Sequence, residues 1–398
     1  MWPRLIAQRA PSAPPNGLET RGLPERTAAP FCARSLIVVS FFWAATAAAL
    51  DPLSSAEVCG RCHRAIFDAW KLSSHAQAME SRLFQDVLEM AETEFGPAAR
   101  KTCLGCHAPL AAPAGDLGLV KKVSWEGVTC DYCHSLREVS LQGPNPVVTL
   151  TQTSVKSGPL QETAPAPHGT VFSAVHTSSL VCAPCHEYRN ASGFPVLSTY
   201  SEWLNSSYGR EGKQCQSCHM SKVAGDVVDP RVQRSSVARI NLHQMPGSHS
   251  LEQLTSAFRA HMTTLRDGDK LQVVVEVSNQ KAGHYLPTGS PLRQIVLEVR
   301  ADSYAGQHFR EERTYARTVA DSQGTVLRRE HVAFLKAAKV VSDTRLAPSE
   351  KRTETFAFPI RAGSQTVVKA TFWYYYSPLA RIESQQRIVF LRLNRMVR

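Results

Sequence analysis

Five copies of one short cysteine–histidine pattern carry most of the chemistry that this sequence offers. In each copy, two cysteines are separated by two residues and a histidine follows directly: Cys59–His63, Cys103–His107, Cys130–His134, Cys182–His186 and Cys215–His219. Thiols at this spacing add to the vinyl groups of a haem, and the adjoining histidine ligates the iron. Zinc sites and disulfides do not require a histidine after the second thiol. Ten of the eleven cysteines lie in these motifs, so the pattern indicates c-type haem attachment.

The motifs predict five covalently attached haem c groups and name their attachment residues. The thiols would be those of Cys59, Cys62, Cys103, Cys106, Cys130, Cys133, Cys182, Cys185, Cys215 and Cys218. The proximal iron ligands would be His63, His107, His134, His186 and His219. The remaining thiol, Cys32, precedes an apolar segment and would be lost with the leader.

A second axial ligand for each iron must come from the nine histidines outside the motifs. His75 follows His63 by twelve residues, after apolar spacing that predicts a short helix over 65–72. Before the fourth motif, either His168 or His176 is a candidate, and we favour His176. His75 and one of these two are therefore predicted distal ligands.

Three further histidines stand beside turn-forming residues. His243 and His249 lie six residues apart around a Pro-Gly turn and can point at different irons. His284 lies on a loop punctuated by glycine and proline, between two predicted strands. From there it could reach out of a β domain and cap a haem, which would tie two domains together.

The first 49 residues resemble a targeting leader. Arg34 precedes a short apolar stretch, and small residues with Ala-x-Ala spacing follow, as in a secretory signal. The apolar run over 36–50 is shorter than the roughly 20 residues that span a bilayer. We therefore expect a periplasmic or extracellular protein, with membrane association through an uncleaved N-terminus as the alternative.

Residues 50–265 are predicted to form a mainly α-helical and irregular haem domain. Apolar spacing predicts helices over 79–100 and 251–262, and residues 140–170 look like a long surface connection. Five haems would share this region at roughly 43 residues each, too few for separate cores. The haems must then share one core, with porphyrin edges close together.

Residues 266–398 contain no cysteine and show β-branched alternation. Strands are predicted over 271–277, 294–300, 353–358 and 367–376, with weaker candidates over 308–318, 325–335 and 387–393. About seven strands at this spacing favour an immunoglobulin-like β-sandwich. The aromatic run over 372–376 would place alternate rings in the core and on the outer face.

Several segments are similar to one known family. They are Trp70 with Ser74-His75, Ser179–Val181, Thr199–Trp203 leading into the fifth motif, His243–His249 and Asn279–Gly289. In these the chain resembles the cytochrome c-554 type of multihaem cytochrome, which is grouped with hydroxylamine oxidoreductase and pentahaem nitrite reductase. The resemblance implies two histidines per iron, with the distal ligands His75, His176, His243, His249 and His284. The chain has five motifs where that cytochrome has four, and none has the lysine that typifies pentahaem nitrite reductase.

These features favour an electron-transfer protein over an enzyme. No catalytic constellation is found beyond the haem motifs. The alternatives are an oxidoreductase with one open haem iron that acts on a small nitrogen or sulphur compound, and a filament subunit that stacks haems. Expected partners are redox proteins, either other cytochromes or quinol-oxidising membrane complexes. The net charge of +11 is largely offset by ten haem propionates, so nucleic acid is not an expected partner.

Overall fold

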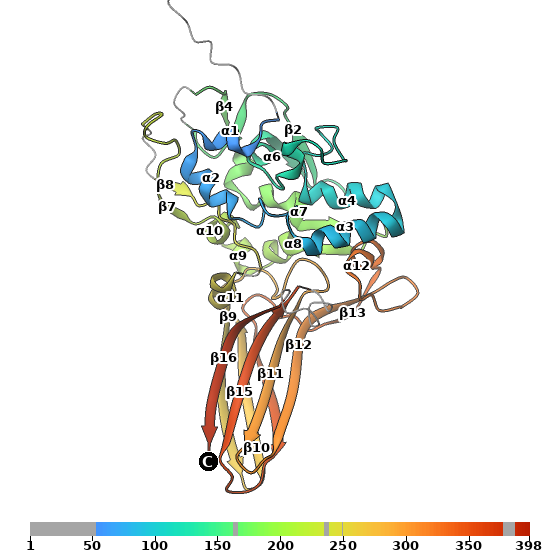
Figure 1. Ribbon diagram of the computed structural model, residues 1–398, viewed down its shortest axis with the longest axis vertical. Coiled ribbons are helices and arrows are strands. Elements are labelled where there is room, and N and C mark those ends of the chain that lie inside the picture. Colours follow the sequence, from blue (N-terminus) through green and yellow to red (C-terminus); the bar gives the residue numbers. More distant parts are fainter. Residues whose placement is uncertain (1–52, 162–165, 235–238, 249, 377–386) are drawn as a thin grey trace, which may run out of the picture. The chain divides into compact units, whose positions relative to one another are not determined.

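The computed structural model describes residues 53–161, 166–234, 239–248, 250–376 and 387–398. All of them belong to one compact unit of the chain, Ala47–Arg398. Helices and short strand pairs make up the described chain as far as Ala257, and long antiparallel strands dominate after it (Figure 1). The predicted leader, 1–49, lies outside the described residues.

The first region contains many short helices. They are α1 (Ala56–Gly60), α2 (Arg64–Lys71), α3 (Arg82–Phe95), α4 (Pro97–His107), α5 (Lys122–Trp125), α6 (Cys130–Ser135), α7 (Ala183–His186), α8 (Thr199–Leu204), α9 (Ser207–Arg210), α10 (Gln216–His219) and α11 (Leu251–Ala257). Two 3-10 turns, η1 (Ala174–Thr177) and η2 (Ser179–Cys182), precede the fourth motif.

Short two-stranded sheets connect these helices. The pairs are β1 (Leu136–Ser140) with β2 (Val147–Leu150), β3 (Lys156–Gly158) with β4 (Thr170–Phe172), β5 (Glu187–Arg189) with β6 (Pro195–Ser198), and β7 (Lys222–Ala224) with β8 (Arg239–Asn241). The predicted surface connection over 140–170 therefore contains strands, and its Ser157 is buried.

The helix predicted over 79–100 is two helices. Ser81 caps α3 by accepting a hydrogen bond from the Phe84 amide, and Gly96 ends it with a φ of 77°. Pro97 then begins α4, because proline at the first helical position loses no helix hydrogen bond. Apolar residues on the two helices form one small core around Met79 and Leu104.

The C-terminal region consists of two antiparallel sheets. The three-stranded sheet has the order β14 (Lys351–Pro359), β10 (Lys270–Asn279), β9 (Phe258–Asp267). The five-stranded sheet has the order β13 (Lys339–Asp343), β12 (His308–Ala320), β11 (Gln294–Ser303), β15 (Thr366–Tyr375), β16 (Arg387–Val397), and Figure 1 shows its four longest strands side by side. One apolar core, which includes Val275, Leu297 and Phe372, draws residues from both sheets.

Six of the seven predicted strands are confirmed as β10, β11, β12, β14, β15 and β16. The aromatic run also behaves as predicted. Phe372 and Tyr374 lie in the shared core, whereas Trp373 and Tyr375 pack with Val296 on the opposite face of the sheet. The alternation follows from the strand period of two.

Two element predictions were wrong. The helix predicted over 251–262 ends at Ala257, and Phe258 starts β9, so strand structure begins before residue 266. Leu254, Phe258 and Met262 recur at intervals of four, which suits a helix and also an alternating strand. The strand predicted over 325–335 is replaced by helix α12 (Glu330–Lys336), which buries Ala333.

The helical region and the β region share side-chain contacts. Phe194 and Val196 pack with Leu292, Val319 and Ala333 in a second apolar core. The side-chain Nδ2 atom of Asn190 also donates to the Ala337 carbonyl at 2.7 Å. Among the described residues, none of the helices has both the length and the apolar character needed to cross a membrane.

Candidate functional site

Each Cys-x-x-Cys-His motif occupies about one turn of helix. The second and third motifs lie within α4 and α6, and the fifth begins at the residue that precedes α10. The first runs from α1 to the start of α2, and the fourth runs from η2 into α7. Residues three and four apart share one side of a helix, so both thiols and the histidine of a motif face the same way. This arrangement suits one haem edge and its iron.

The motifs cluster in space. Three thiol pairs from different motifs lie close together: Cys59 with Cys130, Cys106 with Cys185, and Cys182 with Cys215. The first motif therefore lies beside the third, and the fourth lies between the second and the fifth.

The ten motif cysteines are available for haem attachment. None of them forms a disulfide in the part of the chain that the structure describes, and only Cys218 is exposed. Burial raises the pKa of Cys103 and of Cys133 to about 11, so both stay protonated at neutral pH. The disulfide interpretation is therefore not supported for these residues.

Histidine rings approach one another in five pairs. Their ring-centre separations are 6.1 Å for His63–His168, 6.3 Å for His75–His186, 5.6 Å for His134–His176, 6.4 Å for His134–His243 and 6.4 Å for His219–His284. Two imidazoles bound through Nε2 to opposite sides of one metal, at about 2 Å each, have ring centres about 6 Å apart. His134 belongs to two of the five pairs, so the pairs fit at most four irons with two axial histidines each.

Burial keeps these histidines in the form that binds metal. It lowers the pKa of His75, His107 and His219 to about 4. It lowers the pKa of His134 and His186 to about 3. The rings are then neutral at pH 7, and a neutral imidazole has a nitrogen lone pair for an iron.

Backbone carbonyls fix the orientation of several rings. The Nδ1 atom of His63 donates to Val227 O at 2.6 Å, and that of His134 donates to Ser157 O at 2.6 Å. In the same way, His243 donates to Asn241 O at 2.7 Å and His284 to Tyr285 O at 2.9 Å. Such bonds fix the tautomer and direct Nε2 away from the backbone, as is usual for metal-binding histidines.

His176 differs in this respect. Its ring stacks beside His134, but its Nε2 atom lies 2.8 Å from the Cys133 carbonyl, so the nitrogen that usually ligates is engaged. The Nδ1 atom of His176 is buried and has no hydrogen-bond partner in the described part of the chain. His243 fits the position opposite His134 better.

His107 is the motif histidine without a second histidine beside it among the described residues. Its ring stacks on Phe84, with ring centres 3.7 Å apart. His249, the remaining distal candidate, lies outside the described residues. The second axial position of this iron therefore stays a prediction.

The segment that holds His75 depends on Gly127. The His75 carbonyl accepts a hydrogen bond from the Val128 amide at 3.0 Å, and the Trp70 indole donates to the Val128 carbonyl at 2.9 Å. Gly127 has a φ of 72°, and a β-carbon there would overlap the His75 carbonyl oxygen. Only glycine allows this approach.

Gly127→Ala should displace His75 and weaken its hold on the iron of the fourth motif. Optical and electron paramagnetic resonance (EPR) spectra should show part of one haem converted to high spin. Gly193→Ala is the matched control, because Gly193 has a φ of 75° with open space around it. Both variants carry backbone strain of about 1–2 kcal/mol. If both spectra match the unaltered protein, Gly127 does not position His75.

The sequence favoured His176 over His168 as a distal ligand, and it did not predict the backbone carbonyls that orient the histidine rings. His168 lies in the Pro- and Ser-rich segment before β4, where no periodicity marks a ligand. The acceptors are backbone carbonyls, of Val227, Ser157 and Asn241, so the residue types at these positions do not reveal them. Only the fold brings each carbonyl next to its histidine ring.

Comparison with known proteins agrees with this geometry. The family model described as "Cytochrome c554 and c-prime" matches residues 58–135. Cytochrome c-554 of Nitrosomonas europaea is 34% identical over 94 residues, which cover 22% of this chain and 40% of that protein. The matched part thus spans about two-fifths of the relative's length.

A solved structure extends the similarity over most of the chain. The penta-haem cytochrome c552 from Thermochromatium tepidum has a TM-score of 0.69 and 22% sequence identity, covering 87% of this chain and 100% of that one. This match shows a common fold, including the C-terminal strands. The repeated attachment motifs, the family match over residues 58–135 and the shared fold together support a multihaem c-type cytochrome.

Proposed function

We propose that this chain is an exported electron carrier with five haem c groups, one at each motif. The pairing of imidazoles carries the proposal: four motif histidines each face a second histidine, with ring centres 6.1 to 6.4 Å apart. An iron with two protein ligands has no free position for a substrate, which suits electron transfer. When bound, each haem supplies a one-electron iron couple. The protein sets the potential through axial ligands, hydrogen bonds and burial.

The proposed axial pairs follow the ring geometry. They are His63 with His168, His134 with His243, His186 with His75, and His219 with His284. His249 is the proposed second ligand at His107, because it is the remaining candidate from the sequence. The engaged Nε2 of His176 supports leaving it out of the set.

Electrons would move between neighbouring motifs. The contacts of Cys59 with Cys130, and of Cys182 with Cys215, support haem edges that lie close together. Tyr132 lies against the thiols of Cys133 and Cys185, so the third motif also approaches the fourth. A branched relay of short steps follows from this arrangement.

Export and docking complete the proposal. We place the protein in the periplasm or outside the cell, because covalent haem attachment occurs outside the cytoplasm and residues 1–49 resemble a signal peptide. Its partners would be other cytochromes or quinol-oxidising membrane complexes.

The β region would be an immunoglobulin-like sandwich. The two sheets share one core, and their strand orders, β14-β10-β9 and β12-β11-β15-β16 with β13 added, support this assignment. Such a domain would hold the His284 loop against the haem region.

Mass spectrometry of the purified protein tests the central proposal. We expect five haem additions on a chain that starts near Leu50. Fewer than five would contradict the haem count, and a retained leader would contradict cleavage. CO titration of the reduced protein then shows how many irons have an open or readily vacated axial position, because CO binds only to these.

One observation favours a second candidate function. His107 faces Phe84 rather than another histidine among the described residues. If that iron is open, the protein could act on a small nitrogen or sulphur compound there. Stoichiometric CO binding at one haem of the unaltered protein would support this function, and its absence would support the carrier.

A further inference from the structure

We propose that Glu202 is a positioning residue that holds the distal ligand His284 in place, backed by Arg345 from the β region. The inference rests on the proposed ligation of the fifth-motif iron by His284. In this proposal, the ion pair of Glu202 and Arg345, which joins the helical region to the β region, keeps His284 in position to bind that iron.

The His284 loop runs between β10 and β11 and is anchored at both ends. The Asn279 side chain donates to the His284 carbonyl at 2.9 Å, and its oxygen accepts from the Ala282 amide at 3.1 Å. Leu286 exchanges two backbone hydrogen bonds of 2.9 Å with Leu346. The chain between these anchors carries the ligand.

Close packing against the haem region limits this loop. A β-carbon at Gly283 would lie 2.9 Å from the Tyr208 β-carbon and 3.2 Å from the Trp203 ring. The Tyr208 hydroxyl donates to the Gln280 carbonyl at 3.0 Å. The loop therefore rests directly on α8 and α9.

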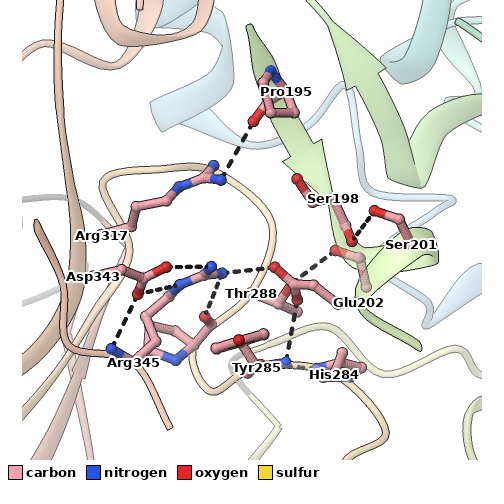
Figure 2. A network of polar contacts seen from close by, with 12 residues as sticks. Pro195, Ser198, Ser201, Glu202, His284, Tyr285, Thr288, Arg317, Asp343 and Arg345 are labelled. Atoms are coloured by element: carbon pink, nitrogen blue, oxygen red, sulfur yellow. Dashed lines mark hydrogen bonds and ion pairs between the residues drawn. The ribbon is translucent and has the colours of Figure 1, made fainter. Parts of the chain in front are cut away.

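Glu202, on α8, holds the residues that follow His284. Its Oε2 atom accepts from the Tyr285 amide at 3.1 Å and from the Thr288 hydroxyl at 2.7 Å (Figure 2). The Tyr285 carbonyl in turn accepts the Nδ1–H of His284. Glu202 thus holds the peptide unit that His284 and Tyr285 share, and the Tyr285 carbonyl beside that unit orients the His284 ring.

Arg345 keeps the carboxylate of Glu202 in this position. Its guanidinium donates to Glu202 Oε1 at 2.8 Å, makes two bonds of 2.8 and 2.9 Å to Asp343, and lies over the Tyr285 ring at 4.6 Å (Figure 2). The Glu202 and Arg345 side chains are only 7% and 8% exposed. A charge so deeply buried needs a partner, so loss of one member disturbs the other.

Glu202→Gln should therefore loosen His284 on one iron. Loss of an outer-shell partner commonly weakens metal affinity about 10–100-fold. CO competes with His284 in the reduced protein, so the apparent CO affinity of the fifth-motif haem should rise by the same factor. The other haems should keep their spectra and CO behaviour.

Matched variants separate positioning from general destabilisation. Glu298→Gln removes a similarly buried carboxylate, 9% exposed, which lies on β11 and pairs with Arg300 and Arg310. It should leave CO affinity unchanged. Thr288→Val should raise CO affinity and Thr288→Ser should not, because serine keeps the hydroxyl that donates to Glu202.

The outcomes are distinguishable. A CO affinity within twofold of the unaltered protein in Glu202→Gln overturns the inference, as does an equal rise in Glu298→Gln. If Glu202→Gln does not fold, the Thr288 pair decides: equal affinities in Val and Ser overturn the inference. His284→Ala is measured in parallel. If His284→Ala gains no CO-binding haem, the proposed ligation by His284 is wrong. If it gains one while the Glu202 and Thr288 variants keep the CO affinity of the unaltered protein, only the positioning role of Glu202 is wrong.

Discussion

His284→Ala will remove one axial ligand from a single haem and leave the others unchanged. The His284 and His219 rings are 6.4 Å apart and nearly parallel, at 22°, so one iron between them explains their separation. EPR should show one low-spin signal replaced by a high-spin signal. The reduced variant should bind one more CO per chain than the unaltered protein.

The effect should stay local, because the loop keeps its other anchors. Asn279, Glu202 and Leu346 hold backbone or neighbouring atoms rather than the His284 ring. His308→Ala is the control, since His308 is exposed and pairs with Asp302 at 2.9 Å in β12. An unchanged spectrum in His284→Ala would reject His284 as a ligand.

The sequence specifies the attachment half of each proposed haem site more directly than the distal half. A motif such as Cys215–His219 is local, so one helical turn brings its thiols and histidine together. The proposed distal ligand His284 comes from a distant segment, and the placement of its ring beside His219 depends on the whole fold. The sequence favoured His176 over His168, because it gives no sign that the Cys133 carbonyl engages the His176 ring.

The type of element could be predicted where the spacing of apolar residues suited either a helix or a strand but not both. The alternation from Leu271 to Val277 suits only a strand, and it is β10. The spacing of Leu254, Phe258 and Met262 suits both a helix and an alternating strand. Phe258 and Met262 belong to a strand because β9 pairs with β10. Tertiary contacts, which no short sequence window contains, made that choice.

The ion pair of Asp131 and Lys156 should have the largest effect on stability. Asp131 lies between the two cysteines of the third motif, and its side chain is 1% exposed, whereas that of Lys156 is 11% exposed. Asp131 also accepts hydrogen bonds from the Ser54 amide at 2.8 Å and the Ser135 hydroxyl at 3.2 Å. It therefore holds β3 and the N-terminal segment against α6.

Asp131→Asn should lower the free energy of unfolding by about 3–5 kcal/mol, because it removes the buried carboxylate that balances the charge of Lys156. Denaturant titration measures the loss. Asp68→Asn is the control: its pair with Arg64 spans 4.0 Å with both side chains 65% exposed, so little change is expected. Adding Lys156→Met to Asp131→Asn should restore most of the stability, since an apolar replacement of a buried pair is often neutral.

The same substitution should also change a haem. The residue after Lys156 is Ser157, whose carbonyl accepts the Nδ1–H of His134 at 2.6 Å and so orients a motif histidine. Without the ion pair, β3 can shift and carry the Ser157 carbonyl with it. The reduction potential of the third-motif haem should therefore change, whereas that of the fifth-motif haem should stay the same. Spectroelectrochemical titration of the variant separates the two haems. An unchanged third-motif potential together with lost stability would mean that the ion pair stabilises the fold without positioning His134.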